Sequence, residues 1–161
     1  MLVMKLFHGT NIDFDEIDLA QSNRFKDFGQ GFYLTDIRRQ ATELARKRAL
    51  QNGGSPIVQV YEFDEKHLTD NSLNVLVFEK PDAQWADFIY KNRSKRRPIF
   101  HHDYDIVIGP IADDGVAYLL DRYREGSFTL QQLADELKFK QLNNQYFFGT
   151  DRAVSLLKRI Q

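Results

Sequence analysis

Residues 28–35, FGQGFYLT, place two glycines one residue apart directly before a run of apolar and aromatic residues. Glycine lets the backbone turn tightly and approach a ligand without a side chain in the way. An apolar and aromatic run that follows turn residues predicts a short buried strand. We therefore interpret this stretch as a loop that leads into a strand, and the rest of the chain has to pack around it.

Two further strand-like runs carry a polar residue where they meet a loop or close to it. One is residues 6–10, LFHGT, and the other is residues 144–150, NQYFFGT, near the far end of the chain. A ligand cleft between packed strands needs polar side chains from strand ends that lie far apart in sequence. Together the three stretches predict such a cleft.

The composition indicates one domain without a strong electrostatic preference. The chain has 161 residues, of which 28% are charged, a formal net charge of -1 and no cysteine. One hydrophobic core is expected at this length, and the small net charge gives no general attraction to nucleic acid or membranes. The lack of cysteine excludes disulfides, thiolate catalysis and cysteine-bound zinc. The apolar run at residues 1–7 is too short for a signal peptide or a membrane span, so we expect a cytoplasmic protein.

The remaining pattern predicts a mixed α+β domain with helices flanking the strands. Strands are expected at residues 2–7, 57–63, 73–78, 104–109 and 145–148, besides the one after Gly31. Helices are expected from a Thr35 cap to residue 52, from Pro81 toward Pro98, at 112–123, at 129–139 behind a Thr129 and Gln132 capping box, and from Thr150 to residue 160. Residues 11–27 are expected to form a loop or a short helical turn that covers something. Strands occur both singly and in adjacent pairs, which favours α+β over a strict βαβ winding.

His8, Tyr33 and Gln145 resemble, in their order and local context, the histidine, tyrosine and glutamate triad of diphtheria-toxin-like and PARP-like ADP-ribosyltransferases. The chain also looks like a bacterial family catalogued as a domain of unknown function, with similar strings at residues 27–35, 105–114 and 144–146. That resemblance runs from about Leu6 to Leu157. It implies the ADP-ribosyltransferase fold, in which two small sheets pack across a cleft that binds NAD in a bent conformation.

The resemblance also implies roles for individual residues. His8 would hydrogen-bond a ribose hydroxyl of NAD, and Gly9 would offer its backbone N–H and C=O to the nicotinamide carboxamide. Tyr33 would stack on the nicotinamide ring, since an aromatic face attracts the cationic ring of oxidised nicotinamide. Thr10 and Gly31 are expected to line the same NAD site.

The third position departs from that pattern, because Gln145 stands where such enzymes often carry glutamate. An amide can hydrogen-bond the ribose 2′-OH, but it cannot carry negative charge or take a proton. A positioned general base contributes on the order of a hundredfold to ten-thousandfold in rate. We therefore predict a single transfer, onto an acceptor that is already nucleophilic or is activated by another carboxylate. Asp113 and Asp114 are candidates for that carboxylate, with helix capping as the alternative.

Other charged residues leave alternatives open. Arg24 either pairs with the pyrophosphate of NAD as a planar donor or is a surface arginine. The five cations between residues 91 and 97 either form a solvated helix end or grip phosphates of NAD or of a nucleic-acid acceptor. Residues 101–103, HHD, are of types that commonly bind metal ions. Adjacent residues on an extended chain point to opposite sides, so we expect no metal site.

The sequence therefore predicts an enzyme that uses NAD as a substrate and moves one ADP-ribose to a macromolecular acceptor, protein or nucleic acid. A non-catalytic module that kept an NAD or ADP-ribose cleft is the first alternative, and a plain structural or interaction domain is the second. The resemblance further implies a bacterial toxin restrained by a neighbouring antitoxin, or a phage-defence effector, acting in its own cell without a membrane partner.

Overall fold

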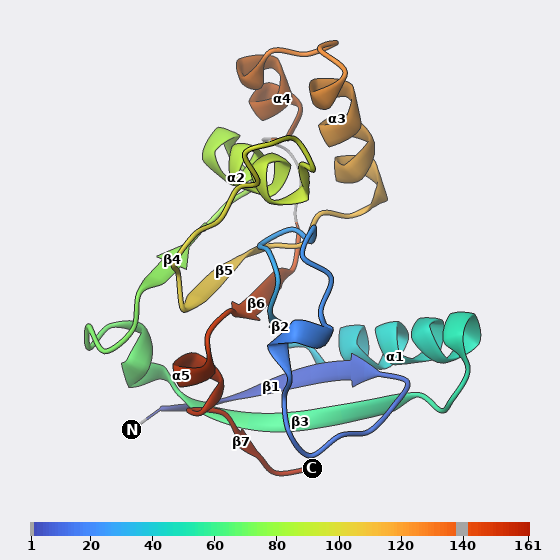
Figure 1. Ribbon diagram of the computed structural model, residues 1–161, viewed down its shortest axis with the longest axis vertical. Helices are drawn as coiled ribbons and strands as arrows, with labels where there is room; N and C mark the ends of the chain where they lie inside the picture. The colour runs from blue at the N-terminus through green and yellow to red at the C-terminus, as the bar shows by residue number, and fades with distance from the viewer. Residues whose placement is uncertain (1, 138–141) are drawn as a thin grey trace.

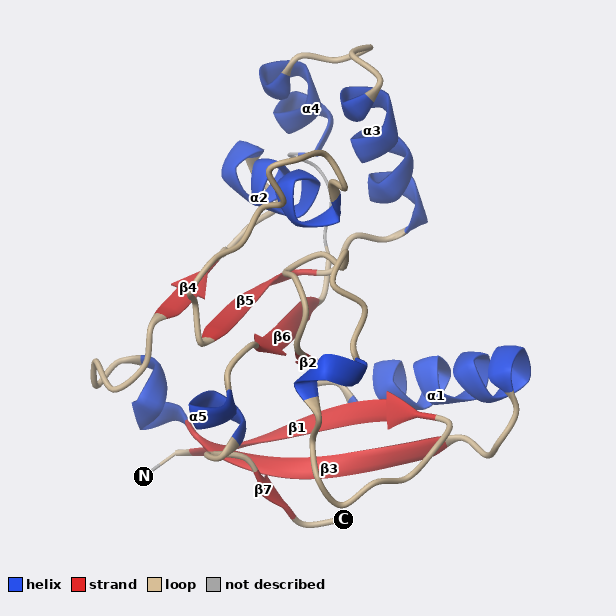
Figure 2. Ribbon diagram, in the orientation of Figure 1, coloured by secondary structure: helices blue, strands red, loops and turns tan. Residues whose placement is uncertain are grey.

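The computed structural model describes residues 2–137 and 142–161 (Figure 1). Within them the chain forms two small sheets and five α-helices, which confirms the expected α+β class. One sheet has three strands in the order β1-β3-β7, and the other has four in the order β2-β6-β5-β4. Figure 2 shows the four-stranded sheet lying between the three-stranded sheet and a group of helices formed by α2, α3 and α4.

The elements have the following bounds. The strands are β1 Val3–Thr10, β2 Phe32–Leu34, β3 Ile57–Asp64, β4 Val75–Val77, β5 Ile106–Pro110, β6 Asn144–Phe148 and β7 Lys158–Arg159. The helices are α1 Arg38–Asn52, α2 Ala83–Arg93, α3 Asp114–Arg124, α4 Leu130–Leu137 and α5 Asp151–Val154. Short 3-10 turns at Leu19–Gln21 and Glu65–Leu68 complete them. Among the described residues, no helix combines the length and the apolar character needed to cross a membrane.

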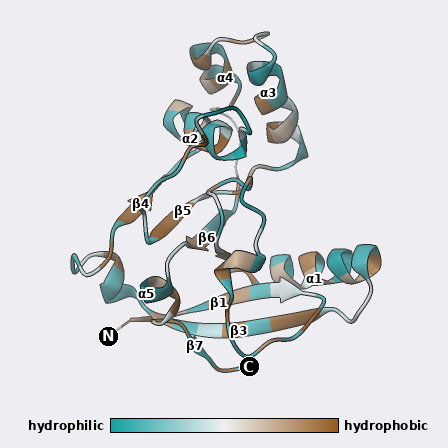
Figure 3. Ribbon diagram, viewed as in Figure 1, coloured by the Kyte–Doolittle hydropathy of each residue, from teal (hydrophilic) through white to brown (hydrophobic). Residues whose placement is uncertain are grey.

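Side chains alternate along the strands and divide the structure into layers. The two sheets face each other across a core to which Leu6, Phe63 and Phe148 contribute. The other face of the four-stranded sheet packs against α2, α3 and α4 around Trp85 and Phe147. The outer turns of α1 are largely hydrophilic, whereas β4 and β5 are largely hydrophobic (Figure 3). Successive side chains of β5 and β6 therefore point alternately into the core between the two sheets and into the core under the helices.

Helix α1 packs directly on β1 because small residues let the two backbones approach. Ala41 and Ala45 are buried, and a Cβ added at Gly9 would lie 2.2 Å from the carbonyl oxygen of Ala41. Only glycine fits there. Leu50 is 91% exposed, so the apolar pattern of this helix extends beyond its buried face. The close contact brings the side chains of α1 to the end of β1.

Several helix boundaries differ from the sequence expectation. Thr35 does not cap α1, which begins at Arg38 behind Ile37; the Thr35 hydroxyl instead accepts from the Ile37 N–H at 3.1 Å. Pro81 lies before the N-cap of α2, because the Asp82 carboxylate accepts from the Trp85 N–H and starts the helix there. The predicted helix at 129–139 is confirmed to residue 137, and residues 138 and 139 lie outside the described residues.

The closing helix predicted up to residue 160 is wrong. Only Asp151–Val154 is helical, and Lys158–Arg159 form β7 on the edge of β3. The N–H of Ile160 donates to the carbonyl of Val60 at 2.8 Å, and the N–H of Val60 donates to the carbonyl of Gln161 at 2.9 Å. Pairing with the open edge of β3 satisfies backbone groups that a helix would have left exposed on that strand.

A buried carboxylate joins the C-terminal segment to the four-stranded sheet. Asp105 is 1% exposed and accepts from Arg152 Nε at 3.0 Å, from the Thr150 hydroxyl at 2.6 Å and from the Asn74 N–H at 2.8 Å. Burial alone raises the pKa of Asp105, but the hydrogen bonds from Arg152, Thr150 and Asn74 outweigh it and lower that pKa to about 2. The ionised form therefore stabilises the fold.

We predict that Asp105→Asn lowers the free energy of unfolding at pH 7 by roughly 2 to 3 kcal/mol, because that is what a pKa lowered from 3.8 to about 2 corresponds to. This stabilisation is present above the unfolded pKa and is lost as the pH falls toward the folded pKa. Urea unfolding of both proteins between pH 7 and pH 3 measures it. Asp103→Asn, with a 91% exposed side chain, is the control. A stability difference that stays constant down to pH 3 would contradict the assignment.

Candidate functional site

The candidate site lies where β1 and β2 separate. Phe7 and Thr35 form one isolated antiparallel pair, with the Phe7 N–H donating to the Thr35 carbonyl at 2.7 Å and the Thr35 N–H donating back at 2.9 Å. The next hydrogen-bonded pair in that register would be Gly9 with Tyr33. Both residues are described, and no backbone hydrogen bond joins Gly9 and Tyr33, so β1 and β2 separate after the Phe7 and Thr35 pair.

Side chains replace the missing backbone pairing. Nδ1 of His8 lies 2.7 Å from the carbonyl oxygen of Tyr33, and Nη1 of Arg48 donates to the carbonyl of Gly9 at 3.1 Å. Strand geometry directs the N–H of Gly9 to the same side as that of Phe7, into the opening. Within the part of the chain that is described, this N–H has no partner outside the β1–β3 ladder. It is therefore free to donate to a ligand.

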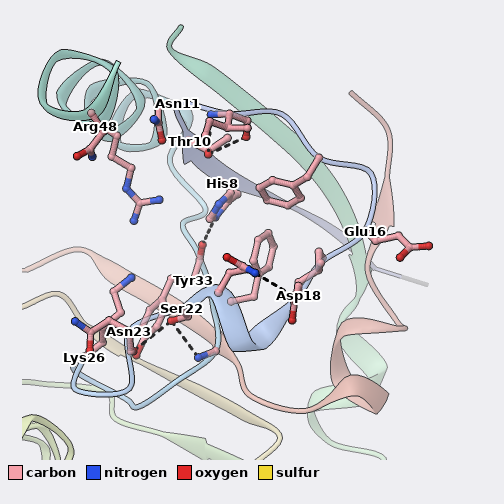
Figure 4. Close-up of a pocket in the computed structure, with 17 residues that line it drawn as sticks. His8, Thr10, Asn11, Glu16, Asp18, Ser22, Asn23, Lys26, Tyr33 and Arg48 are labelled. Carbon is pink, nitrogen blue, oxygen red and sulfur yellow. Dashed lines mark hydrogen bonds between the residues drawn. The ribbon is translucent and has the colours of Figure 1, made fainter. Parts of the chain in front are cut away.

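A cavity of ≈ 630 Å³ opens beside His8 (Figure 4). Its outer wall is the loop that follows β1, which the sequence predicted to cover something. Buried Gln59 holds this loop, because its Nε2 donates to Asp13 Oδ1 at 2.8 Å and to the Phe14 carbonyl at 3.1 Å. Thr10 turns the chain into the loop, as its hydroxyl donates to the Ile12 carbonyl at 3.0 Å.

His8 is a neutral hydrogen-bond acceptor in this cavity. Its burial lowers its pKa to about 4, against a smaller opposing effect of the hydrogen bond to Tyr33, and the charges of Arg48 and Lys26 lower that pKa further. A carbonyl oxygen only accepts, so Nδ1 of His8 must carry the proton. Nε2 is then unprotonated and can accept a hydrogen bond from a ligand hydroxyl.

Two cations face each other across the same cavity. Arg48 reaches in from α1 and Lys26 from the loop before β2, with their charged ends directed toward one another (Figure 4). Burial lowers the pKa of both side chains, and the charge of Arg48 lowers that of Lys26 further, against a smaller opposing effect of the Asp27 carboxylate, which itself pairs with Arg93. Among the described residues neither forms an ion pair with a carboxylate. Partly buried cations without counterions favour an anionic ligand.

Tyr33 forms the wall between this cavity and a second one. Its hydroxyl donates to the Gly29 carbonyl at 2.6 Å and accepts from the Phe28 N–H at 3.0 Å. Both hydrogen bonds fix the loop at residues 28–31, called the glycine loop below, against the Tyr33 side chain. Burial raises the pKa of Tyr33, so the phenol stays neutral. The Lys26 ammonium lies 4.8 Å from the centre of the Tyr33 ring. One face of this ring therefore already attracts a cation.

The second cavity, of ≈ 370 Å³ and mostly apolar, is lined by Gly9, Tyr33 and Gln145 among others. Gln145 lies at the start of β6, and its Nε2 donates to Asp27 Oδ2 at 3.0 Å and to the Pro110 carbonyl at 3.4 Å. The predicted site residues thus divide between adjoining cavities. The first cavity is lined by His8, Thr10, Gly31 and Tyr33, and the second by Gly9, Tyr33 and Gln145.

Three predicted site residues do not join this arrangement. Arg24 lines a separate cavity of ≈ 440 Å³ together with His102, so the pyrophosphate role assigned to it has no support from its position. Asp113 caps α3 by accepting from the Val116 N–H at 2.8 Å, and Asp114 lies exposed in the first turn. Neither aspartate lines the two cavities at the strand opening. Helix capping, the alternative reading, accounts for Asp113.

The basic segment at residues 91–97 is partly engaged within the fold. Lys91 pairs with Asp87 at 2.8 Å and Arg93 pairs with Asp27, whereas Lys95, Arg96 and Arg97 are exposed. Its cations do not line the cavity beside His8. The segment is therefore a charged surface next to the site rather than part of it.

His102 has a structural role in the glycine loop. Its Nδ1 accepts from the Tyr104 N–H at 3.2 Å, and its Nε2 lies 2.7 Å from the carbonyl oxygen of Phe28. Both ring nitrogens are thereby used, and burial lowers the pKa of His102. Within residues 2–137 and 142–161 no group of three or more potential ligands could hold a metal ion.

Sequence reasoning missed Lys26, Asp27 and Arg48. Arg48 follows Ala41 by seven residues and Ala45 by three, and a helical wheel places it next to the buried face. That spacing could have identified it. Lys26 and Asp27 lie in an irregular loop, where no periodic pattern indicates which side chains turn inward.

The fold and the site define an α+β protein whose two small sheets separate around a polar cavity. The chain matches the family described as "Protein of unknown function (DUF3990)" over residues 4–159, and it belongs to that family. The sequence strings had indicated a family of unknown function, and this match agrees with them. No curated protein and no solved structure matches the chain.

We predict that His8 is neutral and protonated on Nδ1 at pH 7, and that it titrates with a midpoint of about 4. Long-range ¹H–¹⁵N NMR spectra of the imidazole measure both properties. Because the unfolded chain binds this proton at about pH 6.5, His8 lowers the stability as the pH falls from 6.5 toward 4. A ring that is protonated on Nε2, or already cationic at pH 6, would contradict the role of His8 as an acceptor.

Proposed function

We propose that the protein is a mono-ADP-ribosyltransferase that binds NAD in the opening between β1 and β2. The observation that carries this proposal is that four features line the two adjoining cavities that share Tyr33. These are a neutral acceptor on His8, a free N–H on Gly9, the ring of Tyr33 and two unpaired cations. Each matches a different part of NAD, and the resemblance to the ADP-ribosyltransferases assigns three of them.

The diphosphate of NAD would lie between Lys26 and Arg48. Both cations are partly removed from water and repel each other, so a dianion between them would relieve the repulsion and supply the missing counterions. Arg48 is anchored to the Gly9 carbonyl and so has a fixed position at the strand opening. This replaces the pyrophosphate role first given to Arg24.

The nicotinamide end would bind at Gly9 and Tyr33. The ring face of Tyr33 that attracts the Lys26 ammonium suits the cationic ring of oxidised nicotinamide. On binding, Lys26 would move from this face to the diphosphate. Nε2 of His8 would accept a hydrogen bond from a ribose hydroxyl, which is possible because the ring is neutral at physiological pH.

The reaction breaks the bond between ribose C1′ and the nicotinamide nitrogen. Nicotinamide leaves with the bonding electron pair as a neutral molecule, so its departure needs no acid. The ribose carries the positive charge until the acceptor's nucleophilic atom bonds to C1′ and releases its proton to solvent. Gln145 Oε1 would accept a hydrogen bond from the 2′-OH during this step. It takes no proton, which is consistent with a single transfer to an acceptor that is already nucleophilic.

A second candidate is a module that binds NAD or ADP-ribose without cleaving it. The observation in its favour is the amide of Gln145 at the position where related enzymes often carry a carboxylate. In either case the acceptor or partner would be a macromolecule, protein or nucleic acid. We further propose a cytoplasmic toxin or defence effector, which rests on the resemblance alone.

The test uses purified protein, labelled NAD and a cell lysate analysed by mass spectrometry. We expect nicotinamide release and label on one class of macromolecule. Arg48→Met should raise the KM for NAD about 10- to 100-fold, the effect of one charged hydrogen bond to phosphate. Arg46→Met, on an exposed turn of the same helix, is the matched control and should leave KM unchanged.

Other outcomes separate the candidates. NAD that binds in calorimetry but stays intact would select the binding module. NAD that neither binds nor reacts would contradict both candidates, and equal KM values for the two arginine variants would contradict the assigned diphosphate site.

A further inference from the structure

Asp27 connects three distant segments at the edge of the proposed NAD site. It lies in the loop before β2, and its side chain is only 14% exposed. Its Oδ1 accepts from Nε of Arg93 at 2.8 Å, at the end of α2, and Nη2 of Arg93 also donates to it. Its Oδ2 accepts from Nε2 of Gln145 at 3.0 Å, on β6. Each carboxylate oxygen therefore has a defined partner, and Arg93 fixes the carboxylate in place.

These contacts determine how the Gln145 amide is oriented. Its NH₂ group faces two acceptors, the Asp27 carboxylate and the Pro110 carbonyl at 3.4 Å. Turning the amide over would place its oxygen against a carboxylate and a carbonyl with no donor between them, which is strongly unfavourable. Oε1 has no hydrogen-bond donor among the described residues. Gln145 lines the cavity that Gly9 and Tyr33 share, so this oxygen is left for a ligand.

We propose that Asp27 is a positioning residue that holds the Gln145 amide with its oxygen toward the ribose, so that the pair performs the task of a single glutamate. This inference rests on the proposed transferase function. The Asp27 carboxylate on the NH₂ side draws positive charge to that end of the amide and leaves Oε1 more negative. An oriented and polarised Oε1 is a better acceptor for the 2′-OH as positive charge develops on the ribose. Asp27 in this role acts on the ribose through Gln145 and does not activate the acceptor, which is already nucleophilic.

Replacing Gln145 by the glutamate that related enzymes often carry is expected to lower the activity rather than raise it. Gln145→Glu would set a second carboxylate against Asp27 and the Pro110 carbonyl, with no hydrogen between them. Two carboxylates in such contact share one proton, and one of their pKa values rises. The double variant Asp27→Asn with Gln145→Glu exchanges the amide and the carboxylate between the two positions. It restores a donor and an acceptor at this contact, because the NH₂ of the asparagine can donate to the carboxylate of the glutamate.

The experiment measures nicotinamide release from NAD, with the cell lysate as the source of acceptor and a lysate-only blank subtracted, by wild type, both single variants and the double variant, from pH 5.5 to 9. We expect Asp27→Asn and Gln145→Glu each to lower kcat at pH 8 by about 10- to 100-fold with a smaller change in KM, since misplacing one group costs about that much. The double variant should recover kcat to at least the wild-type value. Only Gln145→Glu should gain activity as the pH falls, because the shared proton then supplies the missing donor.

Asp87→Asn is the matched control, since it removes another ion pair of α2, and it should leave kcat unchanged. Thermal unfolding of each variant corrects for the folded fraction. If Asp27 only stabilised the fold, the corrected kcat would equal wild type in all variants and no new pH dependence would appear, which overturns the proposal. Single variants that do not recover when combined would also overturn it. A wild-type protein that releases no nicotinamide would overturn the proposed function and this inference together.

Discussion

The separation of β1 and β2 directly after the Phe7 and Thr35 pair is the constraint on which the site depends. Two more residues of regular pairing would join Gly9 to Tyr33 and close the opening. The structure keeps it open with side chains that satisfy the freed carbonyls, His8 on Tyr33 and Arg48 on Gly9. An unsatisfied buried carbonyl is costly, so these two contacts stabilise the separated strands. His8 and Arg48 also line the cavity, where their remaining polar groups can contact a ligand.

Packing on either side of the opening supports this geometry. Glycine at position 9 lets α1 approach β1 closely, which brings Arg48 to the strand end. Glycine at position 31 lets β2 lie against β6, because a Cβ there would come within 2.3 Å of the Phe147 ring. The glycines thus serve packing that positions the site, in addition to any approach of a ligand. The covering loop is held from below by Gln59 and by Arg159 of β7, whose Nη1 donates to the Phe14 carbonyl at 2.7 Å.

Local patterns in the sequence predicted most of the elements, because alternation and helix caps are encoded by neighbouring residues. The Thr129 and Gln132 capping box, for example, forms both of its hydrogen bonds. The prediction of a closing helix up to residue 160 is wrong because the apolar residues there, Leu156 and Leu157 among them, fit a helical pattern. In the structure these two leucines pack into the core between the sheets, and the chain then turns to pair with β3. That pairing depends on an open strand edge far away in sequence. The same limit applies to the candidate site. Motifs in the sequence single out His8, Tyr33 and Gln145, which line the two adjoining cavities, whereas the contact between Asp27 and Gln145 joins residues 118 positions apart.

The most direct measurement is a crystal structure with an NAD analogue that cannot be cleaved, in which the oxygen of the nicotinamide ribose ring is replaced by CH₂. We expect the diphosphate between Lys26 and Arg48, the nicotinamide ring on Tyr33 with its carboxamide on the Gly9 N–H, and a ribose hydroxyl within hydrogen-bond distance of Nε2 of His8. An analogue bound in the cavity beside Arg24 and His102, with the opening between β1 and β2 empty, would contradict the central claim.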